Sequence, residues 1–300
     1  MNSLILLLIF LLVGILLKRF LPIKLQTKLL FYLNRLVIYI SLPAMVLVYL
    51  KDIKFDNSFF VPIITAWGVF ILSFLFIYFL SKVLNYSKEI LIAFVMIVSF
   101  TNSSFLGIPF VKAYFGNSAI AYAIIYDQLG SFLILSTLGI TLLFSYTLKK
   151  LNLKEIFIKI ITFPSFIALV ITIFLQDIAY PLWLFNLLKF LSSMLAPVAL
   201  ISIGLNLVIK PPKEEIKPII IALFLKLIFI PLMLIYIFSL LSFNSLSAKV
   251  SIFESAMAPM VTACMLAIMY GIKPNFIATT LGYGVLLSFL TLPIIYTLLS

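Results

Sequence analysis

The residues with the clearest chemical potential form a polar patch inside an apolar stretch. The segment TNSSFLGIP places hydroxyl and amide side chains beside a glycine and a proline. Asn102, Ser103 and Ser104 can donate hydrogen bonds to an anion, while Gly107 and Pro109 both weaken a helix. The patch therefore predicts a binding site for a small polar solute at a helix interruption.

A second polar group consists of acids that fall within apolar stretches. Asp127 lies in AIIYDQLG and Glu254 in SIFESAMAP, whereas the other acids fall between such stretches. Ionisable groups at membrane depth are expensive and commonly mark ion pathways. We expect Asp127, Gln128 and Glu254 to couple an ion, a proton or alternatively a sodium ion near Asn102, Asp127 and Glu254. Lys226 is the one cation at similar depth, and we expect it to be paired or to reach toward the surface.

The composition indicates that these residues lie in membrane helices. The chain of 300 residues is 65% hydrophobic and 10% charged, with a mean hydropathy of +1.30. A bilayer core about 30 Å thick needs roughly 20 helical residues to cross it. The apolar stretches are apolar on all sides, unlike the alternating strands of a membrane barrel. We expect an all-α integral membrane protein with ten transmembrane helices near 3–17, 33–50, 59–80, 90–114, 118–147, 157–175, 182–208, 218–240, 247–270 and 276–299.

The basic residues are unevenly distributed between the two sides. The net charge is +12, and most Lys and Arg residues fall in the odd-numbered loops, from Lys18 and Arg19 onward. This positive-inside bias places both termini on the non-cytoplasmic side of the cell membrane. The surplus is expected to contact membrane lipids and not nucleic acid. We expect the first stretch to be a retained span, since Lys18 and Arg19 follow it and no basic residue precedes it.

The ten stretches contain an internal repeat with an offset of about 155 residues. Because each half holds five spans, an odd number, the two copies enter the membrane from opposite sides, as in many secondary transporters. We expect two inverted repeats, 1–150 and 151–300. The matched pairs are Pro43 and Pro197, Gly116 and Gly271, and Ser131 and Ser288.

The repeat gives Pro109 an equivalent proline in the second half, Pro259. We expect the spans 90–114 and 247–270 to be broken at these positions. Irregular backbone at membrane depth is tolerated only inside protein or beside a polar cavity. Half-helices that begin near Gly107 and Pro259 would point free N–H groups and the positive end of a helix dipole at a bound anion.

Five segments resemble the signature segments of the auxin efflux carrier family, which includes plant auxin exporters and bacterial permeases for small acids. These segments are LPAMV, TNSSFLGIPFVKAYFG, YDQLGSFLILSTLG, APVALISIGLNL and ESAMAPMVTACMLAIMYG. The resemblance implies a fold similar to the bile-acid/sodium symporters, with helices 4 and 9 broken and crossing at Pro109 and Pro259. The short central loop, 148–156, resembles the bacterial permease type.

The resemblance also implies how such a protein works. Spans 3–5 and 8–10 would form a transport domain that moves against a scaffold of spans 1, 2, 6 and 7, in a homodimer. We expect a secondary active transporter that moves a small organic anion by elevator-like alternating access. Ala258 stands where sodium-coupled relatives carry a glutamine after Glu254, which favours a proton over sodium. The substrate-binding residues expected are Asn102, Ser103, Ser104, Gly107, Pro109, Pro259 and Thr262.

Enzymes are the competing class. The chain contains no histidine, which excludes zinc-type H-E-x-x-H and Ser-His intramembrane proteases. Tyr126 and Asp127 supply a first Y-D of an aspartyl protease, but no G-x-G-D sequence supplies the second aspartate. We expect no catalysis, no cofactor and no resident metal. No nucleotide-binding motif is present, and a transporter-fold receptor without transport remains the alternative.

Overall fold

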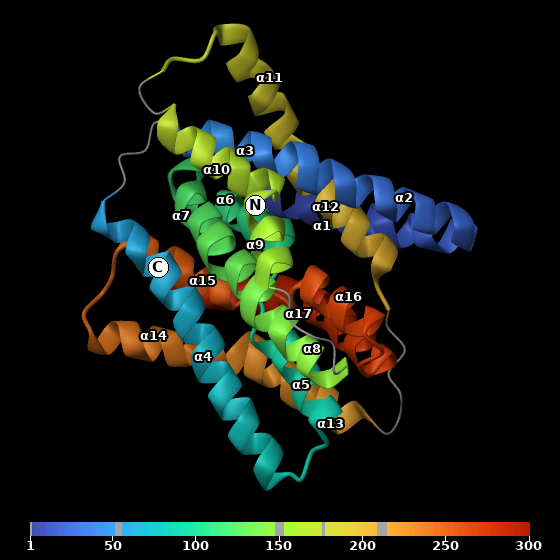
Figure 1. Cartoon of the computed structure of the whole chain (residues 1–300). Helices are drawn as coiled ribbons and strands as arrows, with labels where there is room; N and C mark the ends of the chain where they lie inside the picture. The colour runs from blue at the N-terminus through green and yellow to red at the C-terminus, as the bar shows by residue number, and fades with distance from the viewer. Residues whose placement is uncertain (1, 52–55, 148–152, 176–177, 209–214) are drawn as a thin grey trace.

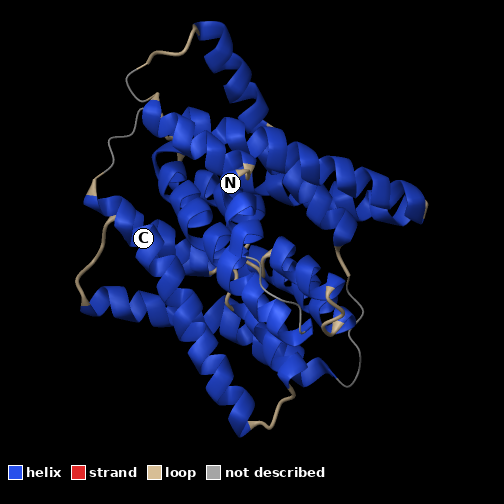
Figure 2. Ribbon diagram, in the orientation of Figure 1, coloured by secondary structure: helices blue, strands red, loops and turns tan. Residues whose placement is uncertain are grey.

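The computed structural model describes residues 2–51, 56–147, 153–175, 178–208 and 215–300. Most of the described residues are in helices, and there is no strand among them (Figure 2). The predicted all-α membrane class is therefore supported. The expected boundary between the two repeats, at 150 and 151, and part of the central loop lie outside the described residues.

The first half of the chain begins with long helices and then becomes interrupted. Proline or π-helical turns divide several of its helices, because both disturb the regular i to i−4 bonding. The helices are α1 (Asn2–Phe20), α2 (Ile23–Leu36), η1 (Val37–Ser41), α3 (Leu42–Tyr49), η2 (Asn57–Phe59), α4 (Phe60–Val83), α5 (Lys88–Val98), η3 (Ser103–Gly107), α6 (Ile108–Phe115), η4 (Asn117–Ala119), α7 (Ile120–Ile125), η5 (Tyr126–Phe132), η6 (Leu135–Gly139) and α8 (Ile140–Thr147).

The second half has a comparable series of helices. Its longest uninterrupted helix is the last of the chain, which continues through Pro293. The helices are α9 (Leu153–Ile161), α10 (Pro164–Phe174), α11 (Leu182–Ser193), α12 (Leu195–Asn206), α13 (Ile216–Phe224), η8 (Leu225–Phe229), α14 (Ile230–Leu240), α15 (Leu246–Ser255), α16 (Val261–Met269) and α17 (Pro274–Leu299).

Six continuous helical stretches among the described residues are long and apolar enough to cross a membrane. Interruptions shorten other apolar helices, notably between α5 and η3, between α9 and α10, and between α15 and α16. The count of ten crossings and the inverted repeat remain predictions. The six stretches are Ile23–Tyr49, Asn57–Val83, Asn117–Tyr146, Leu182–Asn206, Ile216–Leu240 and Pro274–Leu299.

The helices pack in two groups. In the first group α12 contacts α1 and α2, and α3 contacts α10 and α11 (Figure 1). Gly14 of α1 and Gly204 of α12 allow these two helices to touch closely. A Cβ at Gly14 would meet the carbonyl oxygen of Ile201, and a Cβ at Gly204 would meet that of Leu11. Small residues permit such close backbone approach between membrane helices.

The second group surrounds the interrupted helices. In this group α4 contacts α15 and η5, α15 contacts α14, and α17 contacts α13 and α16. The two groups meet where α12 contacts η3, where α1 contacts α6 and where α3 contacts α7. The helix formed by η3 and α6 therefore lies at the boundary between the two groups.

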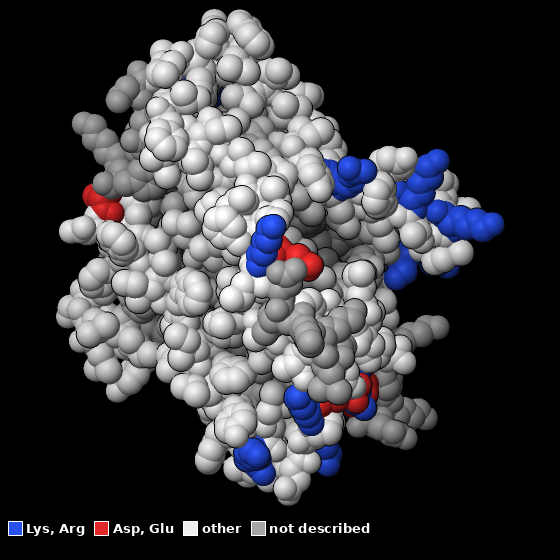
Figure 3. All heavy atoms as spheres, in the orientation of Figure 1, with Lys and Arg blue, Asp and Glu red and all other residues white. Residues whose placement is uncertain are grey.

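Exposed charged side chains gather in a few places. On the face drawn in Figure 3, Lys and Arg concentrate at the projecting end of α2 and around the lower ends of α4 and α5, and most of the remaining surface is uncharged. Such a distribution suits a protein whose middle faces lipid.

Candidate functional site

The helix interruption after α5 pairs with the interruption between α15 and α16. Thr101 and Pro259 form an isolated antiparallel bridge at the centre of this pairing. The two short extended segments therefore cross, each satisfying backbone groups of the other. Two backbone hydrogen bonds frame the bridge, from the Asn102 amide to the Ala258 carbonyl (3.0 Å) and from the Met260 amide to the Phe100 carbonyl (3.2 Å).

Pro259 fits this pairing because of the bridge's register. The framing bonds make Thr101 and Pro259 a non-hydrogen-bonded pair, in which neither residue uses its own N–H toward the other strand. Proline has no N–H to offer, so Pro259 loses no bond here. Gly284 of α17 packs directly against it, and a Cβ at Gly284 would meet the Pro259 ring.

The prediction that Pro109 marks the crossing is wrong. Thr101 pairs with Pro259, and the helix resumes at Ser103 as the π-helical turn η3, earlier than the expected start near Gly107. Pro109 lies within the first turn of α6, immediately after η3. The wider π turn that precedes Pro109 accommodates the missing N–H there.

Asp127 links the two broken or distorted helices η3 and η5. It is 1% exposed and accepts three side-chain hydrogen bonds. The donors are Ser103 Oγ (2.6 Å) and Ser104 Oγ (2.8 Å) to Oδ1, and Gln128 Nε2 (2.7 Å) to Oδ2. The structure thus brings two predicted substrate residues together with two predicted coupling residues. The serine hydroxyls are engaged by Asp127 and are not free to donate to a ligand in this conformation.

Glu254 lies on the side of η3 that is opposite Asp127. It is fully buried, and neither carboxylate oxygen has a hydrogen-bond partner. The carboxylate occupies the space beside Gly107, where any Cβ would overlap it. Glu254 is also within electrostatic range of Asp127 and Lys226. The two membrane acids therefore flank η3, one held by donors and one without them.

Lys226 is the buried cation of this region. It lies in η8 and is fully buried, and its ammonium group has no hydrogen-bond partner. It therefore does not reach the surface, which was one of the two outcomes expected for it. Its charge interacts with Glu254 and with the buried thiol of Cys264. A buried charge without hydrogen bonds is costly, which makes this group a candidate for a functional role.

The crossing leaves several donors without acceptors. The first N–H groups of any helix lack intrahelical partners. Neither Asn102 before η3 nor Met260 before α16 caps them with its side chain. Asn102 is 2% exposed, and its Nδ2 has no hydrogen-bond partner. These groups are suited to an anion.

A cavity of about 140 Å³ lies beside the crossing, and we call it the crossing cavity. Ser104, Asp127 and Thr262 from the predicted set line it, and most of the remaining wall is apolar. Ile38 and Leu42 line it as well, from the first packing group. The other predicted residues do not line this cavity. They are Asn102, Ser103, Gly107, Gln128, Glu254, Pro109 and Pro259.

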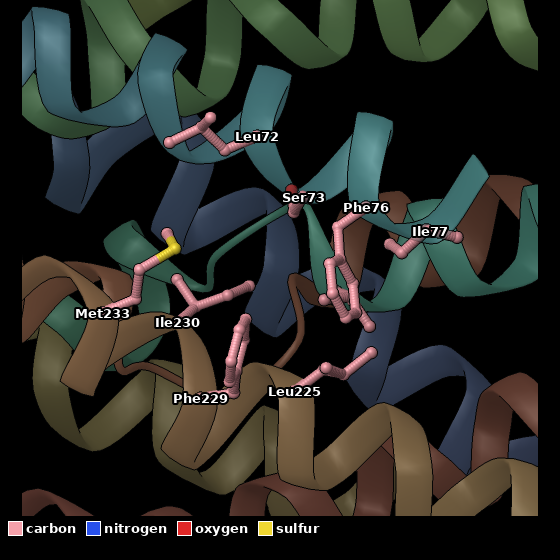
Figure 4. Close-up of a pocket in the computed structure, with 9 residues that line it drawn as sticks. Leu72, Ser73, Phe76, Ile77, Leu225, Phe229, Ile230 and Met233 are labelled. Carbon is pink, nitrogen blue, oxygen red and sulfur yellow. The ribbon is translucent and has the colours of Figure 1, made fainter. Parts of the chain in front are cut away.

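A second cavity, of about 170 Å³, lies between α4 and the η8–α14 helix. Figure 4 shows Leu72, Phe76 and Phe229 among the side chains that face one another across it. Ser73 is the one polar residue among those that line it, and its hydroxyl donates to Ser99 Oγ (2.8 Å) at the end of α5. With no charged group in its wall, this cavity is a poor site for an anion.

Two hydroxyl pairs near the crossing were not predicted. Thr101 Oγ1 lies 3.1 Å from Ser131 Oγ, which connects the bridge to η5. Ser73 connects α4 to Ser99 in the same way. Polar residues inside apolar stretches would have been the signal, but sequence spacing alone does not show which of them meet.

A cation site would need oxygen ligands. The described residues contain no group of three or more His, Cys, Asp or Glu side chains that could hold a metal ion. Of the acids expected near a sodium ion, Asp127 already accepts three bonds, whereas both oxygens of Glu254 are free.

Comparison with known proteins gives a consistent assignment. A family model described as membrane transport protein matches residues 1–296. The chain is similar to an uncharacterized transporter of Methanocaldococcus jannaschii, with 26% identity over 83% of each chain. It is also similar to an uncharacterized transporter of Methanothermobacter thermautotrophicus, with 28% identity over 64% of this chain and 63% of the relative. The match thus spans less than two thirds of the latter protein's length.

Proposed function

The chain belongs to the auxin efflux carrier family of membrane transport proteins, and on that premise we propose that it is a secondary active transporter for a small organic carboxylate anion. It would act in the cell membrane as a homodimer, with both termini on the non-cytoplasmic side, and would couple transport to a proton. The substrate would bind at the crossing of the two interrupted helices.

The pairing of Thr101 with Pro259 is the observation that carries this proposal. It brings two helix starts, η3 and α16, to one place inside the protein, where their uncapped N–H groups and the free Asn102 amide can bind negative charge. Helix N-termini favour anions through both their N–H groups and their dipoles. A carboxylate could therefore bind without a buried arginine.

The acids indicate why the transport would be coupled to a proton. An organic anion in the crossing cavity would face Asp127, and two like charges at this depth repel strongly. Because the two acids flank η3, a proton taken up by either one would lower the negative charge that a bound anion meets there. We assign proton uptake to Glu254, whose oxygens are free, and assign to Asp127 the role of holding η3 through Ser103 and Ser104.

The two packing groups support an elevator-like movement. The crossing cavity lies between η1 and α3 of one group and η3, η5 and α16 of the other. Sliding of the second group along the first would carry the cavity across the membrane while leaving the crossing intact. The contacts between α12 and η3 would be part of the surface along which it slides.

Flux in proteoliposomes tests the proposal. Purified protein would be reconstituted and the uptake of labelled mono- and dicarboxylates measured, with and without an imposed pH gradient or sodium. We expect uptake of at least one carboxylate, stimulated by the pH gradient. Asn102→Ala should abolish it, and Asn186→Ala on the exposed face of α11 is the matched control.

The outcomes separate the alternatives. Carboxylate binding by calorimetry without any flux would identify a receptor instead of a carrier. Stimulation of uptake by sodium and not by the pH gradient would show that the coupling ion is sodium and not a proton. Full flux in the Asn102→Ala variant would show that the crossing is not part of the substrate site.

A further inference from the structure

A third cavity lies far from the crossing, at the end of α4. It is about 360 Å³ in volume and is formed by the last turns of α4, the start of α5 and the end of α8. We call it the α4–α5 cavity. Lys82 and Lys88 line its polar part, and Phe74, Leu91 and Leu142 line its apolar part. None of these residues belongs to the proposed transport site.

The polar part of the cavity carries uncompensated positive charge. Lys82 Nζ lies 5.6 Å from the centre of the Tyr78 ring, and Lys88 Nζ donates to the Ser145 carbonyl (2.8 Å). Both contacts are with neutral groups, and no acidic residue is among those that line the cavity. Glu89, the neighbour of Lys88, instead accepts from the Lys273 amide (3.1 Å). The cavity therefore offers two ammonium groups to an anion.

The apolar part of the cavity determines what kind of anion fits. Phe74 and Leu91 lie one to two helical turns from the lysines toward the middle of α4 and α5, where an apolar membrane helix faces hydrocarbon. Tyr78 and Tyr86 also line the cavity, and tyrosine is enriched at the membrane interface. A free phosphate would use only the lysines, whereas a lipid would use both parts.

The other large cavity provides a contrast. It is about 520 Å³ in volume, lies between α14, α15 and the end of α17, and is lined by Lys249 as its one basic residue together with several hydroxyl groups. The α4–α5 cavity therefore has two basic residues where this one has one, and it lies on the side that the basic loops are expected to place in the cytoplasm. That leaflet carries anionic lipids, which basic pockets between helices bind.

We propose that the α4–α5 cavity binds one anionic phospholipid, with its phosphate between Lys82 and Lys88 and an acyl chain along Leu91 and Leu142. The lipid joins α4, α5 and α8, which all belong to the proposed moving part. Its binding therefore sets how easily that part leaves the cytoplasmic leaflet, and an anionic membrane regulates transport through this contact.

Native mass spectrometry of the purified protein tests the proposal without any transport assay, so its outcome is independent of the proposed substrate and coupling. The protein would be released from nanodiscs that contain equal phosphatidylglycerol and phosphatidylcholine. We expect one retained phosphatidylglycerol, and an affinity for it roughly tenfold to thirtyfold weaker in the double variant Lys82→Gln, Lys88→Gln. The double variant Lys24→Gln, Lys28→Gln, which removes two exposed lysines of α2, should bind like the wild type.

Three results would overturn the proposal. They are equal retention of the two lipids, equal loss in both double variants, and displacement of the lipid by millimolar inorganic phosphate. If the Lys82, Lys88 double variant fails to fold, Leu142→Trp provides the second test. It fills the apolar part and leaves both lysines, so it should lower phosphatidylglycerol retention while the melting temperature stays near that of the wild type.

Discussion

The carboxylate of Glu254 occupies the space beside Gly107 in which the Cβ of any other residue would lie. A glutamate of one broken helix thus rests against the half-helix that follows the other break. Because both carboxylate oxygens lack hydrogen-bond partners, we expect a change in the charge of Glu254 to affect the position of η3. Substitution of Glu254 should therefore affect η3, and substitution of Gly107 in η3 should affect Glu254.

Substitution of Gly107 tests this contact. Gly107→Ala should destabilise the protein by about 1–3 kcal/mol, since an added methyl group has to displace Glu254 or η3. The melting temperature in detergent measures the effect. Gly68→Ala in α4 is the matched control, because a Cβ there meets nothing within 4 Å and alanine favours a helix by up to about 1 kcal/mol. Equal stability of the two variants would show that Glu254 can move away without cost.

Asp127 and Glu254 should behave differently when substituted. Asp127→Ala leaves the hydroxyls of Ser103 and Ser104 without their acceptor, and each orphaned donor costs about 1–3 kcal/mol. The variant should therefore melt at a lower temperature. Glu254→Gln should retain the wild-type melting temperature more closely, and its carboxylate flux should persist without dependence on the pH gradient. A reversed pattern would exchange the roles that we assign to the two acids.

Lys226 and Glu254 should be energetically coupled. Each is fully buried without a hydrogen-bond partner, and each lies in the electrostatic field of the other. Removal of one charge leaves the other uncompensated, so Lys226→Met and Glu254→Gln together should deviate from additivity by about 0.5–3 kcal/mol. A double-mutant cycle on unfolding in detergent measures this energy. The pair Lys226→Met and Glu89→Gln serves as the control, since Glu89 contacts the Lys273 amide, and it should be additive.

The contact between α1 and α12 should depend on its glycines. A Cβ at Gly204 would meet the Leu11 carbonyl and the Gly14 backbone. Gly204→Val should therefore separate the two helices and destabilise the protein by an amount typical of overpacking, about 1–3 kcal/mol, which a lower melting temperature would report. Gly116→Ala is unsuitable as a control because Gly116 has a φ of +81°. Gly68→Val, at an open position, is the better comparison, and an equal loss there would indicate helix propensity as the cause.

Composition and the length of the apolar runs predicted an all-α membrane protein, because a bilayer imposes long apolar runs that are visible in the sequence. Polar residues are easy to recognise within such apolar runs, which is why the sequence alone singles out Asn102, Asp127 and Glu254. They also indicated that the helices near Pro109 and Pro259 are interrupted. The family followed from the residues around those interruptions, and it is confirmed by the family model that matches residues 1–296.

Only the tertiary structure decided which of these residues meet. Proline marks where a helix can break, but the register of the bridge at Thr101 depends on hydrogen bonds between segments that are far apart in the chain. The same holds for the acids, which look alike in sequence. Three donors surround Asp127 and none reaches Glu254, because the packing of η3 against η5 and α15 places the serines on one side and Gly107 on the other.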